Sequence, residues 1–238
     1  MGLKESGLRG SLRNVSVGIS AIPDAVVEDW ERSNPLDDWS NDTAEFAVST
    51  TDPIEGEASL ESVNGNANTI ITKSSGLEET PSKGRVFSSV LRDPGGGDIL
   101  PGFAYGWGGS SGNWQGYEAF LVPSGDEVTL RRYDGGALGD SDSFSNILNV
   151  DFSASTQTAY EVEVEWHDGS GSEPDNEHVV TVYDYDTSAS EDDARGAELG
   201  SASVNDDSYI SGEIAVITES SGDAGVMHDR YWVLGDVE

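Results

Sequence analysis

The stretch YEVEVEWHDG, residues 160–169, alternates large apolar side chains with glutamates as far as Trp166. In a β-strand, successive side chains point to opposite faces, so the apolar residues share one face and the acidic residues share the other. The apolar set is Tyr160, Val162, Val164 and Trp166, and the acidic set is Glu161, Glu163 and Glu165. The pattern predicts a strand with one face in a core and a solvated outer face.

Similar short runs continue on both sides, separated by Gly, Asp, Asn and Ser. We expect strands at residues 44–49, 57–62, 68–73, 85–92, 101–107, 116–122, 127–133, 159–167, 178–185, 198–204, 211–218 and 226–234. Residues 143–149 are the one weak candidate for a helix or turn. A dozen strands without long helices predict an all-β protein, built as a two-sheet sandwich or a barrel.

The chain of 238 residues has a net charge of -33, and its basic residues are nine Arg and only three Lys. Such a surplus repels itself unless salt screens it, and at ~1 M salt the Debye length is only ~3 Å. The composition therefore predicts a high-salt environment, with an acidic protein of ordinary salt as the alternative. Nucleic acid is disfavoured as a partner, because phosphate contacts need clustered Lys and Arg.

Cysteine is absent, which excludes disulfides, thiolate zinc sites and a cysteine nucleophile. No run of 18 apolar residues is present, so we expect no membrane insertion. The N-terminus lacks the continuous apolar stretch of a secretory signal, and we therefore expect no export by that route.

The first 25 residues differ from the acidic remainder, because residues 1–22 carry a net charge of +2. Apolar and basic side chains are spread among glycines, which suits neither a stable helix nor a plain linker. We predict a docking arm at 1–25 that orders against an acidic partner, followed by one domain at 26–238. The candidate docking residues are Leu3, Leu8, Arg9, Leu12 and Arg13. The alternative is a strand and loop that tuck onto the same domain.

Several motifs, taken in order, resemble the laminin-G-like, concanavalin A-like jelly-roll superfamily. They are VVEDWERSNPLDDWSNDTAEFAVSTTDPIEGEASLE near the start, GYEAFLVPSGDEVTLRRYDGG, AYEVEVEWHDG and EHVVTVYDYD in the middle, and DDSYISGEIAVIT with VMHDRYWV at the end. The resemblance implies a two-sheet antiparallel jelly-roll sandwich that binds carbohydrate or protein. Such domains frequently bind calcium, which the acid-rich turns 37–42, 134–142 and 168–177 could hold, although solvated loops are the alternative.

The segment ESGLRGSLRNVSVGISAIPD is similar to the N-terminal segment of structural proteins from tailed viruses of haloarchaea. This resemblance implies a non-enzymatic virion protein, either a capsid decoration or turret or a tail fibre module. The arm would dock onto other virion proteins, and the jelly roll would meet a host glycan or glycoprotein as a homo-oligomer on the particle surface. The alternative is a secreted or surface protein that binds or cleaves polysaccharide.

Candidate ligand-binding residues stand in the glycine-rich segment YGWGGSSGNWQGY, residues 105–117. Trp107, Trp114 and Tyr117 offer flat aromatic faces that can stack on sugars, and the glycines allow close approach of a ligand. The alternative is that at least one of these rings fills the core of the sandwich.

Catalytic residues are not expected. The EVEVE strand resembles the E-x-D-x-E strand of laminarinase-type enzymes but has Glu163 in place of the aspartate, and its other face is apolar. We interpret the three glutamates as outer-face solvation. The three histidines, His167, His178 and His228, lack H-x-x-x-H spacing, which favours solvated or hydrogen-bonding roles over a zinc site.

Overall fold

The computed structural model describes residues 25–63, 68–73, 82–95, 99–170, 172, 174–189, 193–220 and 225–234. These residues form two antiparallel β-sheets packed face to face, together with three short 3-10 helices. The all-β jelly-roll sandwich expected from the sequence is therefore confirmed. The candidate docking residues Leu3, Leu8, Arg9, Leu12 and Arg13 lie outside the described residues.

Sheet A contains eight strands. In spatial order they are β13 (Arg195–Asn205), β12 (Glu177–Tyr185), β11 (Ala159–Trp166), β6 (Arg85–Arg92), β15 (Gly225–Leu234), β4 (Ser59–Ser62) and β3 (Phe46–Ser49), while β1 (Ala25–Glu28) pairs with β15 outside this path. Sheet B contains seven strands. Their order is β10 (Phe144–Asp151), β9 (Glu127–Asp134), β8 (Asn113–Val122), β7 (Ile99–Ser110), β14 (Glu213–Ser220), β5 (Thr69–Lys73) and β2 (Ser40–Asn41).

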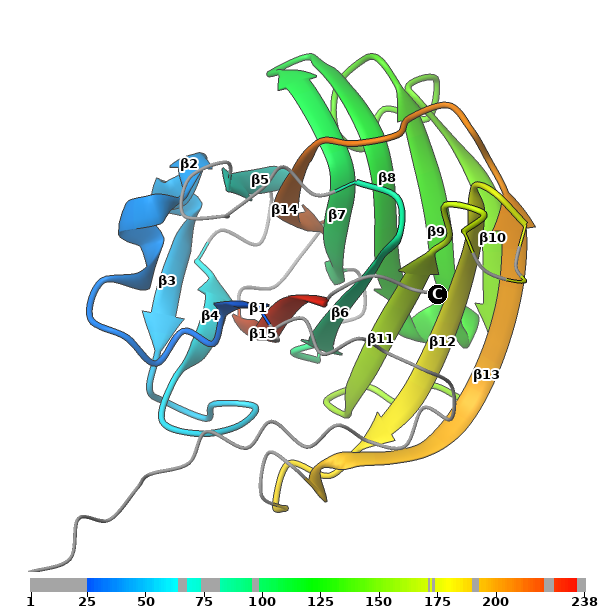
Figure 1. Cartoon of the computed structure of the whole chain (residues 1–238). Coiled ribbons are helices and arrows are strands. Elements are labelled where there is room, and N and C mark those ends of the chain that lie inside the picture. The colour runs from blue at the N-terminus through cyan, green and yellow to red at the C-terminus, as the bar shows by residue number, and fades with distance from the viewer. Residues whose placement is uncertain are drawn as a thin grey trace, which may run out of the picture.

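The strand orders of the two facing sheets correspond: β10 and β13 lie at one edge of the sandwich, and β2 and β3 lie at the opposite edge (Figure 1). The 3-10 helices η1 (Pro35–Asp38) and η2 (Thr43–Glu45) flank β2, and η3 (Pro123–Gly125) joins β8 to β9. No helix among the described residues is long and apolar enough to cross a membrane. At the centre of Figure 1, β1 lies beside β15, with Ala25 opposite Val233.

The core between the sheets contains all four apolar residues of the opening stretch, as predicted. Trp166 is fully buried and lies 5.5 Å from the ring of Tyr105, which in turn stacks on Phe87 at 4.6 Å. Burying each such aromatic side chain contributes roughly 2–3 kcal/mol. Tyr231 ties the layers together, because its hydroxyl donates to the carbonyl of Ala104 at 2.6 Å.

All twelve predicted strands are present, with ends that shift by up to three residues. The expectation for residues 143–149 is wrong, since they belong to the edge strand β10. The register of β10 against β9 shifts between Asn146 and Leu148. This irregularity breaks the two-residue alternation by which a strand is recognised, and so the local pattern misled.

Candidate functional site

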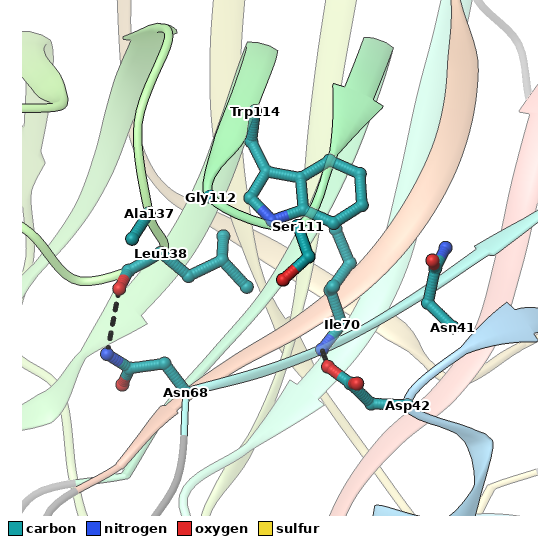
Figure 2. A pocket seen from close by; sticks show the side chains of 9 residues that line it. All are labelled: Asn41, Asp42, Asn68, Ile70, Ser111, Gly112, Trp114, Ala137 and Leu138. Atoms are coloured by element: carbon teal, nitrogen blue, oxygen red, sulfur yellow. Dashed lines mark hydrogen bonds between the residues drawn. The ribbon is translucent and has the colours of Figure 1, made fainter.

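A pocket of about 190 Å³ opens on the outer face of sheet B, the face turned away from the other sheet. Its lining residues are Asn41, Asp42, Asn68, Ile70, Ser111, Gly112, Trp114, Ala137 and Leu138. Ile70 and Trp114 are buried members of a small outer cluster that Leu138 packs against. The pocket thus combines an apolar floor with an exposed polar rim (Figure 2).

The first wall is the short edge pairing of β2 with β5. The backbone N–H of Asp42 donates to the carbonyl of Ile70 at 3.0 Å, and the N–H of Ile70 donates to Oδ2 of Asp42 at 3.2 Å. Asn41 donates through Nδ2 to the hydroxyl of Thr72 at 2.7 Å. These bonds fix the carboxylate and amide side by side at the pocket edge.

The second wall is the β7–β8 hairpin with the loop after β9. The hairpin closes at Ser111 and Gly112, and Gly112 has the left-handed φ of 82° that favours glycine. Trp114 holds the loop by its backbone, which donates to Gly136 and accepts from Gly135, both at 2.9 Å. This pairing brings the following segment, with Leu138, over the outer face of the sheet.

Asn68 bridges the two walls, since its Nδ2 donates to the carbonyl of Leu138 at 3.1 Å (Figure 2). The rim therefore presents amide and carboxylate groups, and Ser111 adds a hydroxyl. Such groups can exchange hydrogen bonds with several hydroxyls of a small ligand, while Trp114 and Ile70 offer apolar contact. No Lys or Arg lines the pocket in the part of the chain that the structure describes.

The predicted aromatic site needs a correction. Trp107, Trp114 and Tyr117 are all buried, with 1%, 5% and 0% of their surface exposed, so they are not displayed on a loop. Tyr117 fills the core between the sheets, as the alternative expectation held. Trp107 stacks on Trp114 at 6.0 Å under the outer face, and only Trp114 lines the pocket.

Sequence reasoning missed Asp42, Asn41 and Asn68 as pocket residues. Two of the acid-rich turns proposed for calcium nevertheless border the pocket, since residues 37–42 include Asp42 and residues 134–142 include Leu138. The composition of each turn predicts a polar loop, but the sequence of neither turn indicates that the two turns lie at the same pocket.

The glutamates of β11 do lie on the outer face of sheet A, but the expectation that they are solvated is wrong for two of them. Glu161 is 1% exposed and Glu163 is 8% exposed, whereas Glu165 is half-buried. Arg195 reaches across from β13 and donates to both buried carboxylates, at 2.8 Å from Nε to Glu161 and 2.7 Å from Nη2 to Glu163.

The same cluster is completed by neutral groups. Ser88 donates to Glu161 at 3.0 Å, and the Arg195 guanidinium lies 4.2 Å from the ring centre of Tyr183. Burial alone would lower the pKa of Arg195, but its bonds to Glu161 and Glu163 raise that pKa above its ordinary value. The cation therefore stays charged, and it covers the carboxylates from solvent.

A second polar cluster on this face holds the loop before β4. Asp229 accepts hydrogen bonds from the Ser59 hydroxyl at 2.7 Å and from the Glu55 backbone at 2.9 Å. The Glu55 carboxylate in turn accepts from Tyr185 and pairs with Arg230. Burial raises the pKa of Asp229 to about 7, against the lowering effect of the bonds from Ser59 and Glu55.

The three histidines are buried, so the solvated alternative is wrong for them. His178 does form hydrogen bonds, with the Tyr105 hydroxyl at Nδ1 and the Asp206 carbonyl at Nε2. Because a carbonyl only accepts, Nε2 carries the proton and Nδ1 accepts from Tyr105. Burial lowers the pKa of His178 to about 4 and that of His228 to about 3.

Among the described residues, no group of three or more His, Cys, Asp or Glu side chains could hold a metal ion. In each acid-rich turn a carboxylate is paired with a cation, namely Asp38 with Arg32, Asp134 with Arg132 and Asp175 with Lys83. These pairs compete directly with calcium for the same oxygens.

No protein-family model matches the sequence, and no curated protein sequence matches it. Solved structures match it in fold. The carbohydrate binding module CBM66 from Bacillus subtilis is 14% identical, with 80% of this chain and 96% of that chain covered and a TM-score of 0.50. The legume lectin-like domain from Entamoeba histolytica is 9% identical, with 82% and 92% covered and a TM-score of 0.52.

The exoplasmic/lumenal domain of VIP36, in a form bound to Ca2+ and Man3GlcNAc, is 12% identical. The match covers 84% of this chain and 87% of the VIP36 chain, with a TM-score of 0.53. At these identities the likeness concerns the fold alone. The chain has a concanavalin A-like jelly-roll fold, of the kind found in lectin-like domains.

Proposed function

We propose that this protein is a carbohydrate-binding jelly-roll domain and that the pocket on sheet B receives the sugar. The observation that carries the proposal is the composition of the pocket, in which exposed amide and carboxylate groups surround an apolar floor that includes Trp114. A sugar ring has the matching character, with hydroxyls at its edge and apolar C–H groups on its faces.

The fold supports the same proposal. Two similar domains are a carbohydrate binding module and the exoplasmic/lumenal domain of VIP36, which was solved in a form bound to Man3GlcNAc. Fold alone does not imply function, so the proposal depends on the pocket.

Calorimetric titration with methyl glycosides of glucose, galactose and mannose tests it. We expect one of them to bind, and we expect Asn68→Ala to weaken that binding about threefold to tenfold, the worth of one net hydrogen bond. Asn149→Ala is the matched control, because Asn149 is exposed on the far edge strand of the same sheet. Equal losses in the two variants, or no binding at all, would contradict the proposal.

The protein is proposed to bind its ligand without cleaving it. Glycosidases need one carboxylate free to act and another protonated across the substrate. Here Arg195 donates to both Glu161 and Glu163, an arrangement that supports a structural role. Hydrolysis of a polysaccharide panel by the wild type, lost in Glu161→Gln with the fold retained, would overturn this part of the proposal.

Calcium dependence is a separate proposal. The VIP36 domain was solved in a Ca2+-bound form. The acid-rich turns of this chain supply carboxylates, but one carboxylate in each turn is engaged with a cation. Repeating the titration with and without a chelator decides whether calcium contributes to binding.

The virion role stays a proposal as well, supported by the charge difference between residues 1–22 and the remainder. On this proposal the arm docks the domain onto a particle in high salt, where a homo-oligomer meets a host glycan. Deleting residues 1–22 should leave a folded domain that no longer joins the particle. Unfolding below roughly 0.5 M salt is expected from unscreened repulsion, and full stability in dilute buffer would remove the high-salt argument.

A further inference from the structure

The cations of the described residues are all engaged with other groups. Nine Lys and Arg residues fall in this part of the chain, while Lys4, Arg9 and Arg13 lie outside it. The ion pairs join Arg32 to Glu28 and Asp38, Lys73 to Glu28, Lys83 to Asp175, Arg92 to Asp52, Arg131 to Glu118, Arg132 to Asp134 and Asp206, Arg195 to Glu161 and Glu163, and Arg230 to Glu55. The ninth, Arg85, has an interaction partner too.

The pocket likewise offers no cation to a ligand from the described residues that line it. Among the described residues that line it, Asp42 is the one ionisable side chain, and it is exposed. Oδ2 of Asp42 accepts from the Ile70 backbone, while among the described residues no hydrogen bond reaches Oδ1. The other polar groups of the rim are the amides of Asn41 and Asn68 and the hydroxyl of Ser111. A ligand in this pocket therefore meets a negative charge, and none of the described lining residues adds a positive one.

We propose that this pocket accepts only saccharides without an anionic group, and that Asp42 enforces the selection. The inference rests on the proposed carbohydrate-binding function and specifies its ligand class as neutral or amino sugars. Uronic acids, sulfated sugars and sialylated ends are excluded, because their anionic group would lie beside Asp42 without an Arg or Lys partner among the described lining residues.

Two physical effects act in the same direction. Like charges within about 5 Å at the edge of a protein repel strongly enough to weaken binding about tenfold. A carboxylate moved against the apolar floor of Ile70 and Trp114 also loses water without gaining a cation. A protonated amino group at the same ring position would instead be attracted by Asp42.

The test is calorimetric titration of the full chain at about 0.15 M and about 1 M salt. The probes are methyl glycosides of glucose, galactose and mannose, together with the three matching uronates. The hexose that binds best is compared with its own uronate. At about 1 M salt the Debye length is only ~3 Å, so the long-range repulsion by the acidic surface is removed and the repulsion by the exposed Asp42 is weakened, while the cost of desolvating the carboxylate remains.

We expect the uronate to bind about tenfold more weakly than its hexose at about 0.15 M salt, and the difference should be smaller at about 1 M salt. Asp42→Asn, which keeps the shape of the rim, should reduce the difference to less than threefold. Asp151→Asn makes the same change of net charge at an exposed position on β10 and should leave the ratio unchanged.

Failure of the inference is distinguishable from failure of the proposed function. Equal affinity for hexose and uronate would overturn the selection by charge while leaving sugar binding intact. A difference that falls equally in both Asp variants would assign the effect to the whole surface and not to Asp42. Absence of binding by every probe would overturn the function and the inference together.

Discussion

Two groups of polar residues, one on the outer face of each sheet, differ in how far the protein satisfies them. On sheet A, the carboxylates of Glu161 and Glu163 lie under Arg195 and are almost inaccessible. On sheet B, Asp42 and Asn68 stand at the rim of a pocket and face solvent. The β11 cluster has its charges neutralised internally, and the pocket leaves its hydrogen-bonding groups available to a ligand.

The difference shows that acidic residues do not by themselves mark a binding site. The EVEVE strand is the most conspicuous acidic motif of the chain, yet its buried charges are satisfied by the protein. The pocket depends on less conspicuous amides. The following four predictions test this contrast, in order of decreasing effect.

Removing the cation from sheet A should have the largest effect. Arg195→Met leaves Glu161 buried beside Glu163 without a counter-charge, and we expect the free energy of unfolding to fall by about 4 kcal/mol. Urea denaturation measures this. Adding Glu161→Gln and Glu163→Gln to the variant should restore most of the loss. A cost below about 1 kcal/mol would mean that the pairs behave as solvated surface charges.

The second prediction concerns His178, a buried titratable residue that the folded protein holds in its neutral form. The pKa of His178 is lowered from 6.5 to about 4, so the unfolded chain binds its proton first as the pH falls. Stability should therefore be lost between pH 6.5 and pH 4, by about 3 kcal/mol at most from this residue.

His178→Gln keeps an acceptor for Tyr105 and removes the titration. Denaturation at pH 7 and pH 4 measures the change, and the variant should lose correspondingly less stability than the wild type. An unchanged difference between the two pH values would show that other groups cause the loss.

Asp229, on the outer face of sheet A, should show the opposite pH dependence to His178, because its contribution to stability is lost as the pH rises. Its pKa is raised from 3.8 to about 7, so its contribution to stability is complete below pH 3.8 and is lost as the pH rises through 7. We expect Asp229→Asn to be more stable than the wild type by about 2 kcal/mol at pH 8, with the advantage shrinking towards pH 4. Thermal unfolding across this range measures it, and a constant difference would exclude titration of Asp229 as the cause.

The smallest effect should come from the rim of the pocket. Asp42→Asn replaces an exposed carboxylate and retains an oxygen that can accept from Ile70, so stability should change by less than about 0.5 kcal/mol. Denaturation under the conditions used for Arg195→Met measures it. A loss above about 2 kcal/mol would mean that the rim is part of the scaffold, and the contrast between the two faces would fail.

Most of the fold could be predicted from local patterns. The alternation at residues 160–166 assigns the two faces of β11 correctly, because side-chain direction in a strand depends on the backbone alone. Strand β10 was missed, because a shift of register against β9 disturbs that alternation. The predicted domain boundaries and the docking arm stay predictions.

The site could be predicted less well, because it is assembled by contacts between distant residues. Asp42 and Ile70 are 28 residues apart, and Asn68 and Leu138 are 70 apart. Arg195 lies 34 residues from Glu161 in the sequence. The local pattern around Glu161 therefore contains no cation that could pair with it, and it predicts a solvated glutamate. Glycine-rich spacing likewise suggested displayed aromatic rings, whereas Trp107 and Tyr117 are covered once the sheets pack.

The pairing of β1 with β15 has a consequence for modularity. Ala25 lies opposite Val233, so the first and last strands that the structure describes are neighbours on sheet A. Domains with adjacent ends can be inserted into a surface loop of another protein without stretching either chain. Since the pocket opens from the outer side of the other sheet, such a graft would leave its mouth accessible. The architecture therefore suits insertion of this sandwich into the surface loops of other proteins.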